Sequence, residues 1–194
     1  MATLLNNTRR LTILLFFIGI IAPSINAQTQ SFQFPDTVVL STKFQNAIKK
    51  QTEEYYRLLY RDSTVTNHYS SSYILEKIDK DSNYYYLFVA EYWIAFHYKE
   101  MIPALIERIT CKKEIGLVNY ADLKIPERIA SGQMETVDHG AYSMDDLFTI
   151  AGRANRLLTE ITGEDFGHVS MYSTQEQLMV LQKKWVAWLN YQIK

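Results

Sequence analysis

Hydrophobic residues recur at helical spacing along most of the chain. From Leu40 to Leu59, apolar side chains follow one another at intervals of three, four and seven positions, with charged residues between them. The same period returns over residues 147–161 and 178–189. The chain has only seven glycines and four prolines, so it is poor in the residues that a turn-rich β fold needs. The pattern therefore predicts an all-α fold.

The most apolar stretch after residue 28 is the segment 73–98. It is too long for a buried strand, and its apolar residues occur on all sides of a helix, so we expect a central helix from about Asn83 to Tyr98. The preceding residues, 62–72, are polar and without a period, which predicts a loop. Pro103 fits the first turn of the helix that follows.

Capping residues mark where the longer helices begin and end. Asp36 or Thr37 is the expected N-cap of the first helix. Residues 143–146 and 173–176 each have the pattern of a capping box, a serine followed three positions later by an acid. Gly163 is the expected end of the helix that starts at the first of these boxes.

Residues 119–142 divide into a helix and a loop. We expect a helix over 119–131, with Pro126 near a helix start and Gly132 as its C-terminal cap. Residues 133–142 show no period and predict an exposed loop.

The first 27 residues have the order of a secretory signal peptide. Arg9 and Arg10 precede the apolar run 11–22, and small residues surround Ala27. An uncleaved membrane anchor is the alternative, but a spanning helix needs about 20 apolar residues and this run has about a dozen. We expect cleavage after Ala27, export to the periplasm or the outside medium, and no stable membrane insertion afterwards.

Cleavage would leave about 167 residues, enough for one domain with its own core and too few for two. We expect a flexible leader at residues 28–35. A single helical domain at 36–194 should follow, built as a compact stack or bundle of about five to seven helices.

Charge and cysteine content exclude some classes of protein. The mature chain keeps 18 of the 20 basic and all 21 acidic residues, a net charge near −3, without the basic clusters that nucleic acid binding requires. Cys111 is the only cysteine, so it is either a small hydrophobe at a helix end or a thiol that pairs with another chain. A disulfide-free exported domain favours a bacterial source.

The C-terminal part resembles a known kind of protein. The segment Leu157–Gly167, with the sequence LLTEITGEDFG, and the later Trp185-Val-Ala-Trp188 resemble the ending of short exported bacterial proteins built from HEAT-like helical hairpins. The likeness covers about the last 50 residues, and the chain shows no internal repeat of the length such arrays have. The resemblance implies stacked helices and a binding surface rather than chemistry.

Glu91 is the one charged residue between Tyr84 and Phe96. A buried carboxylate must be paired or protonated, and a carboxyl group kept neutral by burial can act as a general acid. The competing interpretation is structural: an ion pair with Arg108 or Arg153, or a hydrogen bond to a tyrosine.

Asp145 and Asp146 are the other candidate acids. Together with His139 they offer oxygen and imidazole ligands for a divalent ion. Acids also favour a helix N-terminus, which explains the pair without a metal. The four histidines are spread out, with no HExxH pattern, so we expect neither a metal nor another cofactor.

Aromatic residues are abundant: 14 tyrosines, nine phenylalanines and three tryptophans. Most fall on helical stripes and are predicted to be core. Tyr69, Tyr73, Tyr142 and Tyr172 lie in or beside predicted loops and, with His139, are the candidates for contact with a partner.

These observations favour a non-enzymatic module that binds another protein through the loops 62–72 and 133–142, for example an immunity or inhibitor protein directed at a secreted toxin. The alternative is an enzyme acting on glycan or cell-wall material, with Glu91 or the pair Asp145 and Asp146 as acid or base. Inward-facing carboxylates close together in one cleft would favour the enzyme. A broad aromatic face without such a pair would favour binding.

Overall fold

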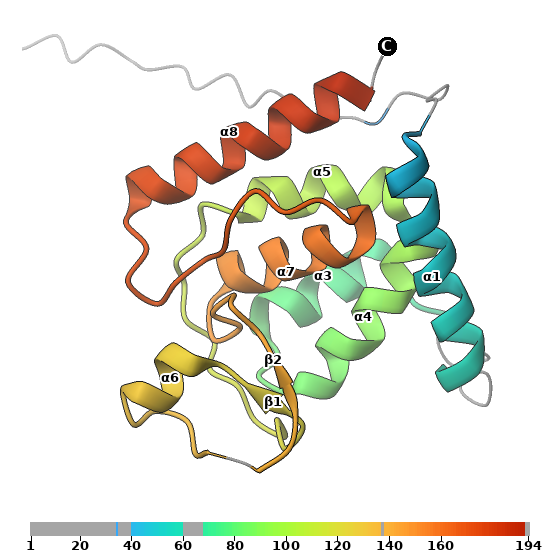
Figure 1. Cartoon of the computed structure of the whole chain (residues 1–194). Helices are drawn as coiled ribbons and strands as arrows, with labels where there is room; N and C mark the ends of the chain where they lie inside the picture. The colour runs from blue at the N-terminus through green and yellow to red at the C-terminus, as the bar shows by residue number, and fades with distance from the viewer. Residues whose placement is uncertain (1–33, 35–39, 60–67, 137, 193–194) are drawn as a thin grey trace, which may run out of the picture. The chain divides into compact units, whose positions relative to one another are not determined.

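The computed structural model describes residue 34 and residues 40–59, 68–136 and 138–192, all of which belong to one compact unit. They form seven helices and a two-stranded sheet (Figure 1): α1 (Thr42–Leu59), α3 (Ser71–Lys80), α4 (Tyr84–Phe96), α5 (Tyr98–Arg108), β1 (Leu123–Lys124), α6 (Pro126–Ala130), β2 (Ala141–Tyr142), α7 (Ile150–Thr162) and α8 (Gln175–Gln192). The predicted all-α bundle is confirmed for this part of the chain. The predicted signal peptide lies outside the described residues, as does the predicted leader except for Phe34.

Helix α7 occupies the centre of the fold. It contacts α1, α3, α4 and α5, and α8 packs on α5 (Figure 1). Thr149 is its N-cap, because the Thr149 hydroxyl accepts a hydrogen bond from the Gly152 amide at 3.1 Å. Gly163 is its C-cap, as predicted, and adopts φ 71°. Ten of its thirteen residues are buried, so its position constrains that of every neighbour.

The side chain of Arg153, on α7, is fully buried and connects four segments. Its guanidinium group donates hydrogen bonds of 2.7–2.9 Å to the carbonyl oxygens of Ile78, Asp81, Gly116 and Leu147. These carbonyls come from α3, the turn after α3, the loop after α5 and the turn before α7. One arginine therefore holds together parts of the chain that are far apart in sequence.

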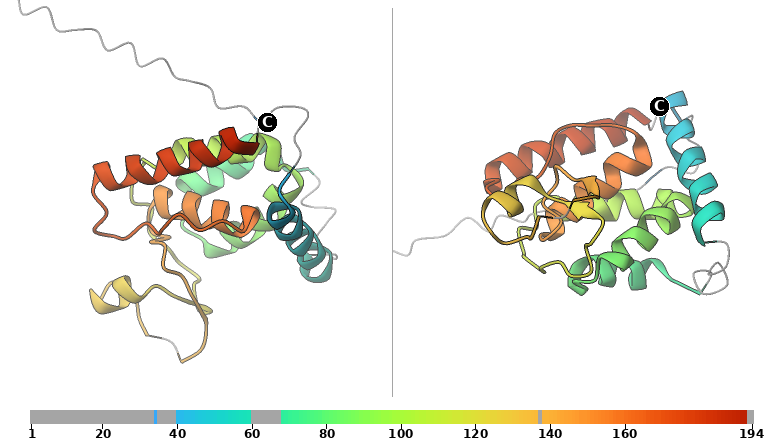
Figure 2. Two further views of the ribbon diagram at one scale, coloured as in Figure 1. Left: turned by 45° about the horizontal axis from the view of Figure 1, so that its top comes forward. Right: turned by 60° about the horizontal axis from the view of Figure 1, so that its bottom comes forward.

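Residues 119–146, which we call the arm, project beyond the helices and carry α6, β1 and β2 (Figure 2, left view). The two strands pair in parallel, with Leu123 opposite Ala141 and Lys124 opposite Tyr142. The arm is mostly irregular backbone, and its few regular elements are short.

Aromatic residues form part of the core, but fewer of the described ones are buried than predicted, and Tyr85, Phe96 and Tyr191 are exposed. All three tryptophans are buried. Trp188 contacts Phe44 and Trp185 in edge-on arrangements, and Phe34 packs against Phe44 and Tyr98. Through these contacts the core joins α8 and α1 to Phe34, which lies before α1 in the sequence.

Several helix limits differ from the prediction. Helix α1 begins at Thr42 rather than at residue 36, because Ser41 caps it by accepting a 3.2 Å hydrogen bond from the Phe44 amide. The proposed caps Asp36 and Thr37 lie outside the described residues. Pro103 lies inside α5 rather than in its first turn, since α5 already starts at Tyr98.

The segment before α4 contains a helix that the prediction missed. Helix α3 starts at Ser71, inside the predicted loop. Ser70 is its N-cap, because the Ser70 hydroxyl accepts a hydrogen bond from the Tyr73 amide. Its buried stripe consists only of Ile74 and Ile78, too few positions for a period to be recognised.

Both predicted capping boxes are wrong in their residues. Residues 143–146 do not begin a helix, because α7 starts only at Ile150 and Asp146 points into the protein. The box of α8 lies one position later than predicted: the Thr174 hydroxyl accepts from the Gln177 amide at 3.2 Å, and the Gln177 side chain accepts from the Thr174 amide at 2.8 Å.

Within the described residues, none of the helices is both long enough and apolar enough to cross a membrane.

Gly152 gives a test of how closely the arm is fitted to α7. A Cβ atom at this position would lie 2.0 Å from the carbonyl oxygen of Asp146. We expect Gly152→Ala to lower the free energy of unfolding by at least about 2 kcal/mol, because backbone has to move to relieve the overlap. Chemical denaturation of the purified protein measures this.

Gly132→Ala is the matched control. Gly132 has φ 75°, but its added Cβ would meet no atom within 4 Å, so only backbone strain of about 1 kcal/mol is expected. An equal or larger loss in Gly132→Ala would contradict the proposed close fit at Gly152.

Candidate functional site

Glu91 lies on α4, where this helix meets α1 and α7. Burial first, and the charge of Glu160 on α7 second, raise the pKa of its carboxyl group to about 7. Arg156, a hydrogen bond from the Gln51 side chain and Lys50 act in the opposite direction. Glu91 is therefore protonated in a large share of molecules at neutral pH.

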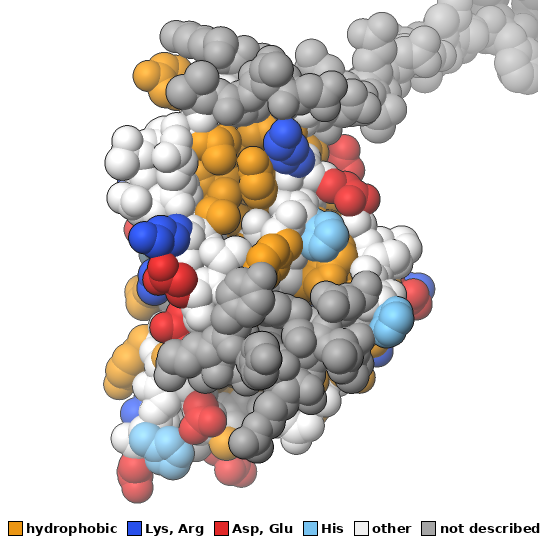
Figure 3. Space-filling view, turned by 90° about the vertical axis from the view of Figure 1, so that its right-hand side faces the viewer, with side chains coloured by type: hydrophobic (Ala, Val, Ile, Leu, Met, Phe, Trp, Pro, Cys, Tyr) orange, Lys and Arg blue, Asp and Glu red, His pale blue; other side chains and the backbone are white. Residues whose placement is uncertain are grey.

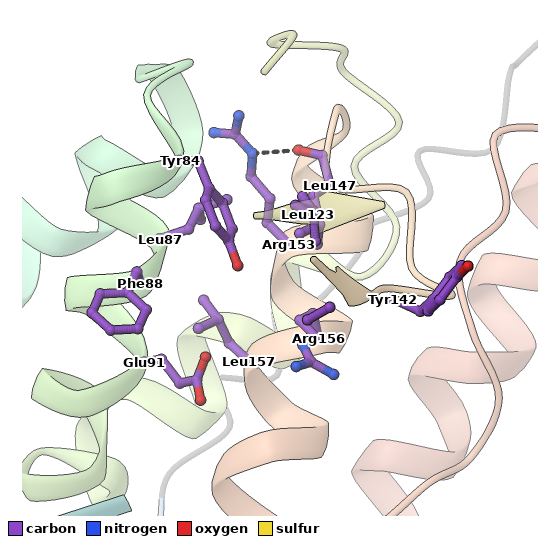
Figure 4. Close-up of a pocket in the computed structure, with 11 residues that line it drawn as sticks. Tyr84, Leu87, Phe88, Glu91, Leu123, Tyr142, Leu147, Arg153, Arg156 and Leu157 are labelled. Carbon is purple, nitrogen blue, oxygen red and sulfur yellow. Dashed lines mark hydrogen bonds between the residues drawn. The ribbon is translucent and has the colours of Figure 1, made fainter. Parts of the chain in front are cut away.

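A cavity of about 30 Å³ adjoins Glu91 (Figure 4). It lies between α4 and α7 and is closed on one side by the arm, and its lining residues are Tyr84, Leu87, Phe88, Glu91, Leu123, Ala141, Tyr142, Leu147, Arg153, Arg156 and Leu157. In Figure 4 the hydroxyl group of Tyr84 and the carboxyl group of Glu91 both point toward the middle of this space. The volume suits about two water molecules.

The ion-pair partners predicted for Glu91 are wrong. Arg108 instead forms a two-pronged ion pair with Asp79 at 2.7 and 2.8 Å, because α5 turns this side of its surface toward α3. Arg153 directs its guanidinium group to the four carbonyls described above. Among the positive charges, that of Arg156 lowers the pKa of Glu91 most. Arg156 itself pairs at 2.6 Å with Glu160, one helical turn further along α7.

Asp146 forms a buried ion pair with Arg128 of α6. The two carboxylate oxygens accept hydrogen bonds of 2.8 and 2.6 Å from the guanidinium group, and both side chains are nearly inaccessible to water. Arg128 also bonds to Glu114 and Gln133 and lies 4.5 Å from the centre of the Phe148 ring. This cluster joins the arm to the turn before α7.

Asp145 is also buried and hydrogen-bonded within the protein. Its carboxylate accepts from the Val169 amide at 2.7 Å and from the Asn155 side chain at 2.8 Å, and Asn155 in turn accepts from the indole N–H of Trp185. Burial raises the pKa of Asp145 to about 6, against the effect of these hydrogen bonds. The structure does not bring Asp145 or Asp146 to the cavity beside Glu91.

The candidate contact residues lie on separate surfaces. Tyr142 and Tyr172 are highly exposed, and His139 is exposed on the arm, 3.4 Å from Asp122. Tyr69 and Tyr73 stand side by side at the start of α3, with ring centres 4.7 Å apart, and are partly buried. Burial raises the pKa of Tyr69.

A second cavity, of about 180 Å³, lies at the base of the arm. Four of its polar lining residues are hydrogen-bonded within the protein: Arg128 as above, the Thr149 hydroxyl with the Gly152 amide, the Ser170 hydroxyl with Glu127 at 2.7 Å, and the Ser173 hydroxyl with the Ser170 amide. These hydrogen bonds stabilise the loops around the cavity.

Metal and nucleic acid sites gain no support from the described residues. In these ranges, no three His, Cys, Asp or Glu side chains are grouped so that they could hold a metal ion. On the face shown in Figure 3, basic and acidic side chains are interspersed over the described surface.

Sequence reasoning selected Glu91 from its isolation in an apolar stretch but missed Gln51, Arg156 and Glu160, the groups that control its charge. The spacing of Arg156 and Glu160 by four positions was a visible signal of a helical ion pair. Met144, which is 60% exposed, was also missed.

Comparison of the chain with protein-family models, curated proteins and solved structures finds no significant match. The resemblance to HEAT-like exported proteins stays a prediction.

The raised pKa of Glu91 predicts a pH-dependent stability. Between about 4.5 and 7 the folded state retains a proton that the unfolded state has lost, so the free energy of unfolding falls as pH rises through this range. Glu91→Gln removes this pH-dependent loss of stability, because glutamine does not titrate. We expect equal stability of variant and parent at pH 5, and a more stable variant at pH 8 by on the order of 3 kcal/mol.

The measurement is urea denaturation at both pH values. Glu107→Gln, at an exposed position on α5, removes the same charge and should show no such divergence. A difference between Glu91→Gln and parent that stays constant from pH 5 to pH 8 would contradict the assignment.

The pair of Arg128 and Asp146 predicts strong coupling between two substitutions. Asp146→Leu alone should cost about 3 to 5 kcal/mol of stability, because it leaves a buried guanidinium group without its partner. Adding Arg128→Met should recover part of this loss. A double-mutant cycle of unfolding free energies measures the coupling, and strictly additive losses would show that the pair does not act as a unit.

Proposed function

We propose that this protein is an exported, non-enzymatic module that binds another protein through its arm. One observation carries the proposal: along residues 142–145 the exposed and buried side chains alternate. Tyr142 and Met144 are 66% and 60% exposed, whereas Ser143 and Asp145 are buried. Tyr142 ends β2 and Met144 follows at a bend directly after it, so two large exposed side chains lie two residues apart in the arm.

The backbone that carries these side chains is held firmly. The Ala141 and Ser143 amides donate to the carbonyls of Asp122 and Lys124 at 2.8 and 2.9 Å. Gly140 allows this approach, because a Cβ there would lie 2.7 Å from the Asp122 carbonyl carbon. A surface fixed before binding loses little conformational entropy when a partner docks.

The residue types suit protein contact. Tyrosine and methionine are enriched at interfaces, since both offer a large contact area and tyrosine adds a polar tip. The Lys124 ammonium lies 5.3 Å from the Tyr142 ring centre, a distance that restrains the ring by a cation–π interaction. Two exposed side chains of this size, on and directly after a hydrogen-bonded strand, are the features expected of a binding hot spot.

The exported location rests on residues 1–27, with their two arginines, apolar run and small residues before position 28. A binding module in the periplasm or outside medium, with a mildly acidic surface, fits an immunity or inhibitor protein directed at a secreted toxin.

One observation favours the competing class, an enzyme acting on glycan material. Glu91 has a pKa of about 7, suited to a general acid, and a second carboxylate, Glu160, lies near enough to influence it. The adjoining cavity of about 30 Å³ is far smaller than a sugar ring needs, which weighs against this role. Binding therefore has the better support.

The test is affinity capture with the tagged protein from the producer's envelope and culture fluid, followed by titration of the captured partner. Tyr142→Ser and Met144→Ser should each weaken binding at least tenfold, because each removes a large buried contact. Neither should change thermal stability, since both side chains are exposed.

Met179→Ser on α8 is the matched control, as Met179 is exposed but lies on a different element. It should leave the affinity unchanged. If it weakens binding as strongly as Met144→Ser while the arm variants bind normally, the binding surface is not the arm.

A further inference from the structure

The excess negative charge of residues 28–194 is concentrated in the arm. Residues 119–146 contain six acidic and two basic side chains, a net charge of −4. The other residues from 28 to 194 contain 15 acidic and 16 basic side chains, a net charge of +1. The arm projects beyond the helices (Figure 2, left view), so the excess lies on a projecting part of the described structure.

Half of the charged groups in the arm are used inside the protein. Arg128 and Asp146 form the buried ion pair described above, so their charges cancel. Asp145 is buried, and Glu127 accepts a hydrogen bond of 2.7 Å from the Ser170 hydroxyl. The other four charged side chains are three exposed acids and one half-buried lysine: Asp122, Glu135, Asp138 and Lys124.

Two of the exposed acids border Tyr142. The Asp122 carbonyl accepts a hydrogen bond of 2.8 Å from the Ala141 amide, and the Asp122 side chain is 81% exposed. The Asp138 carbonyl accepts a hydrogen bond of 3.2 Å from the Lys124 ammonium group, which also lies 5.3 Å from the centre of the Tyr142 ring. Hydrogen bonds of the arm therefore hold both acidic residues next to the exposed tyrosine.

The basic side chains behind Tyr142 do not offset these acids at the surface. Arg153 and Arg156 line the cavity that Tyr142 closes. Arg153 is fully buried and bonded to four carbonyls, and Arg156 pairs with Glu160 at 2.6 Å. His139 lies 3.4 Å from the Asp122 carboxylate and is charged only when protonated.

We propose that the protein bound by the arm has a basic surface, with lysine or arginine side chains around the place that receives Tyr142 and Met144. This inference rests on the proposed binding function and adds the chemistry of the partner. Opposite charges at the edge of an interface accelerate association, whereas desolvated contacts at its centre slow dissociation. Asp122 and Asp138 act on the first step, and Tyr142 and Met144 act on the second.

Hexalysine serves as the probe of the arm in the purified protein without partner, and nitrogen-15 NMR follows the backbone amides. At about 0.01 M ionic strength, where charges act over about 30 Å, we expect saturable shifts that are largest within residues 119–146. At about 1 M this range falls to about 3 Å, and the shifts should vanish. Hexaglutamate should not shift the arm signals at either ionic strength.

Two double variants complete this test. Asp122→Asn with Asp138→Asn should weaken hexalysine binding about fivefold at low salt, because each removes one exposed charge. Glu107→Gln with Glu176→Gln removes the same charge from exposed positions on α5 and α8 and should change binding less than twofold. Shifts spread evenly over the helices, or equal losses in the two double variants, would overturn the inference.

Kinetics with the captured partner distinguish the two proposals. The variant Asp122→Asn with Asp138→Asn should lower the association rate constant about tenfold at low salt and leave dissociation nearly unchanged. Tyr142→Ser should instead raise the dissociation rate constant. Unchanged association in the acidic variant, together with weaker binding by Tyr142→Ser, would refute the basic partner and retain the binding function. Normal binding by Tyr142→Ser and Met144→Ser would refute the arm as the docking surface, and this inference with it.

Discussion

The buried charge of Arg153 is the constraint on which the arrangement of the helices depends. A guanidinium group without access to water is tolerated only where its donors are hydrogen-bonded. Here the acceptors are carbonyl groups from α3, from two turns and from the loop that leads to the arm. Burial lowers the pKa of Arg153 only to about 10, so the group keeps its charge at neutral pH. Its position on α7 thereby determines where the arm leaves the helical body.

The other buried ionisable groups differ in which neighbouring groups stabilise their charge. Asp146 has a guanidinium partner, and Asp145 has two N–H donors. These carboxylates hold loops in place. Glu91 has the neutral side chain of Gln51, an arginine that is engaged with Glu160, and the exposed Lys50. This uneven compensation, more than burial itself, distinguishes Glu91 from Asp145 and Asp146.

Sequence patterns predicted the helices that have long apolar stretches. They did not predict the parts of the structure that depend on residues far apart in the sequence. Helices α7 and α8 could be predicted because each repeats its buried positions over several turns, and α4 because its apolar run is too long for a strand. Helix α3 could not, since Ile74 and Ile78 are its only buried residues. The pairing of Arg128 with Asp146 spans 18 positions and two turns of irregular chain, and no local rule links them. Glu91 was recognised as unusual, but its neighbours depend on which helices pack against α4.

The alternation of side chains at residues 142–145 has an evolutionary consequence. Ser143 and Asp145 are committed to the interior, whereas Tyr142 and Met144 take part in little of the packing. Substitutions at these two outward positions leave the anchoring bonds intact, so a lineage can change these exposed side chains without refolding the scaffold. A single inserted residue between Gly140 and Tyr142 would reverse which side chains face solvent, and such length changes should be rare there.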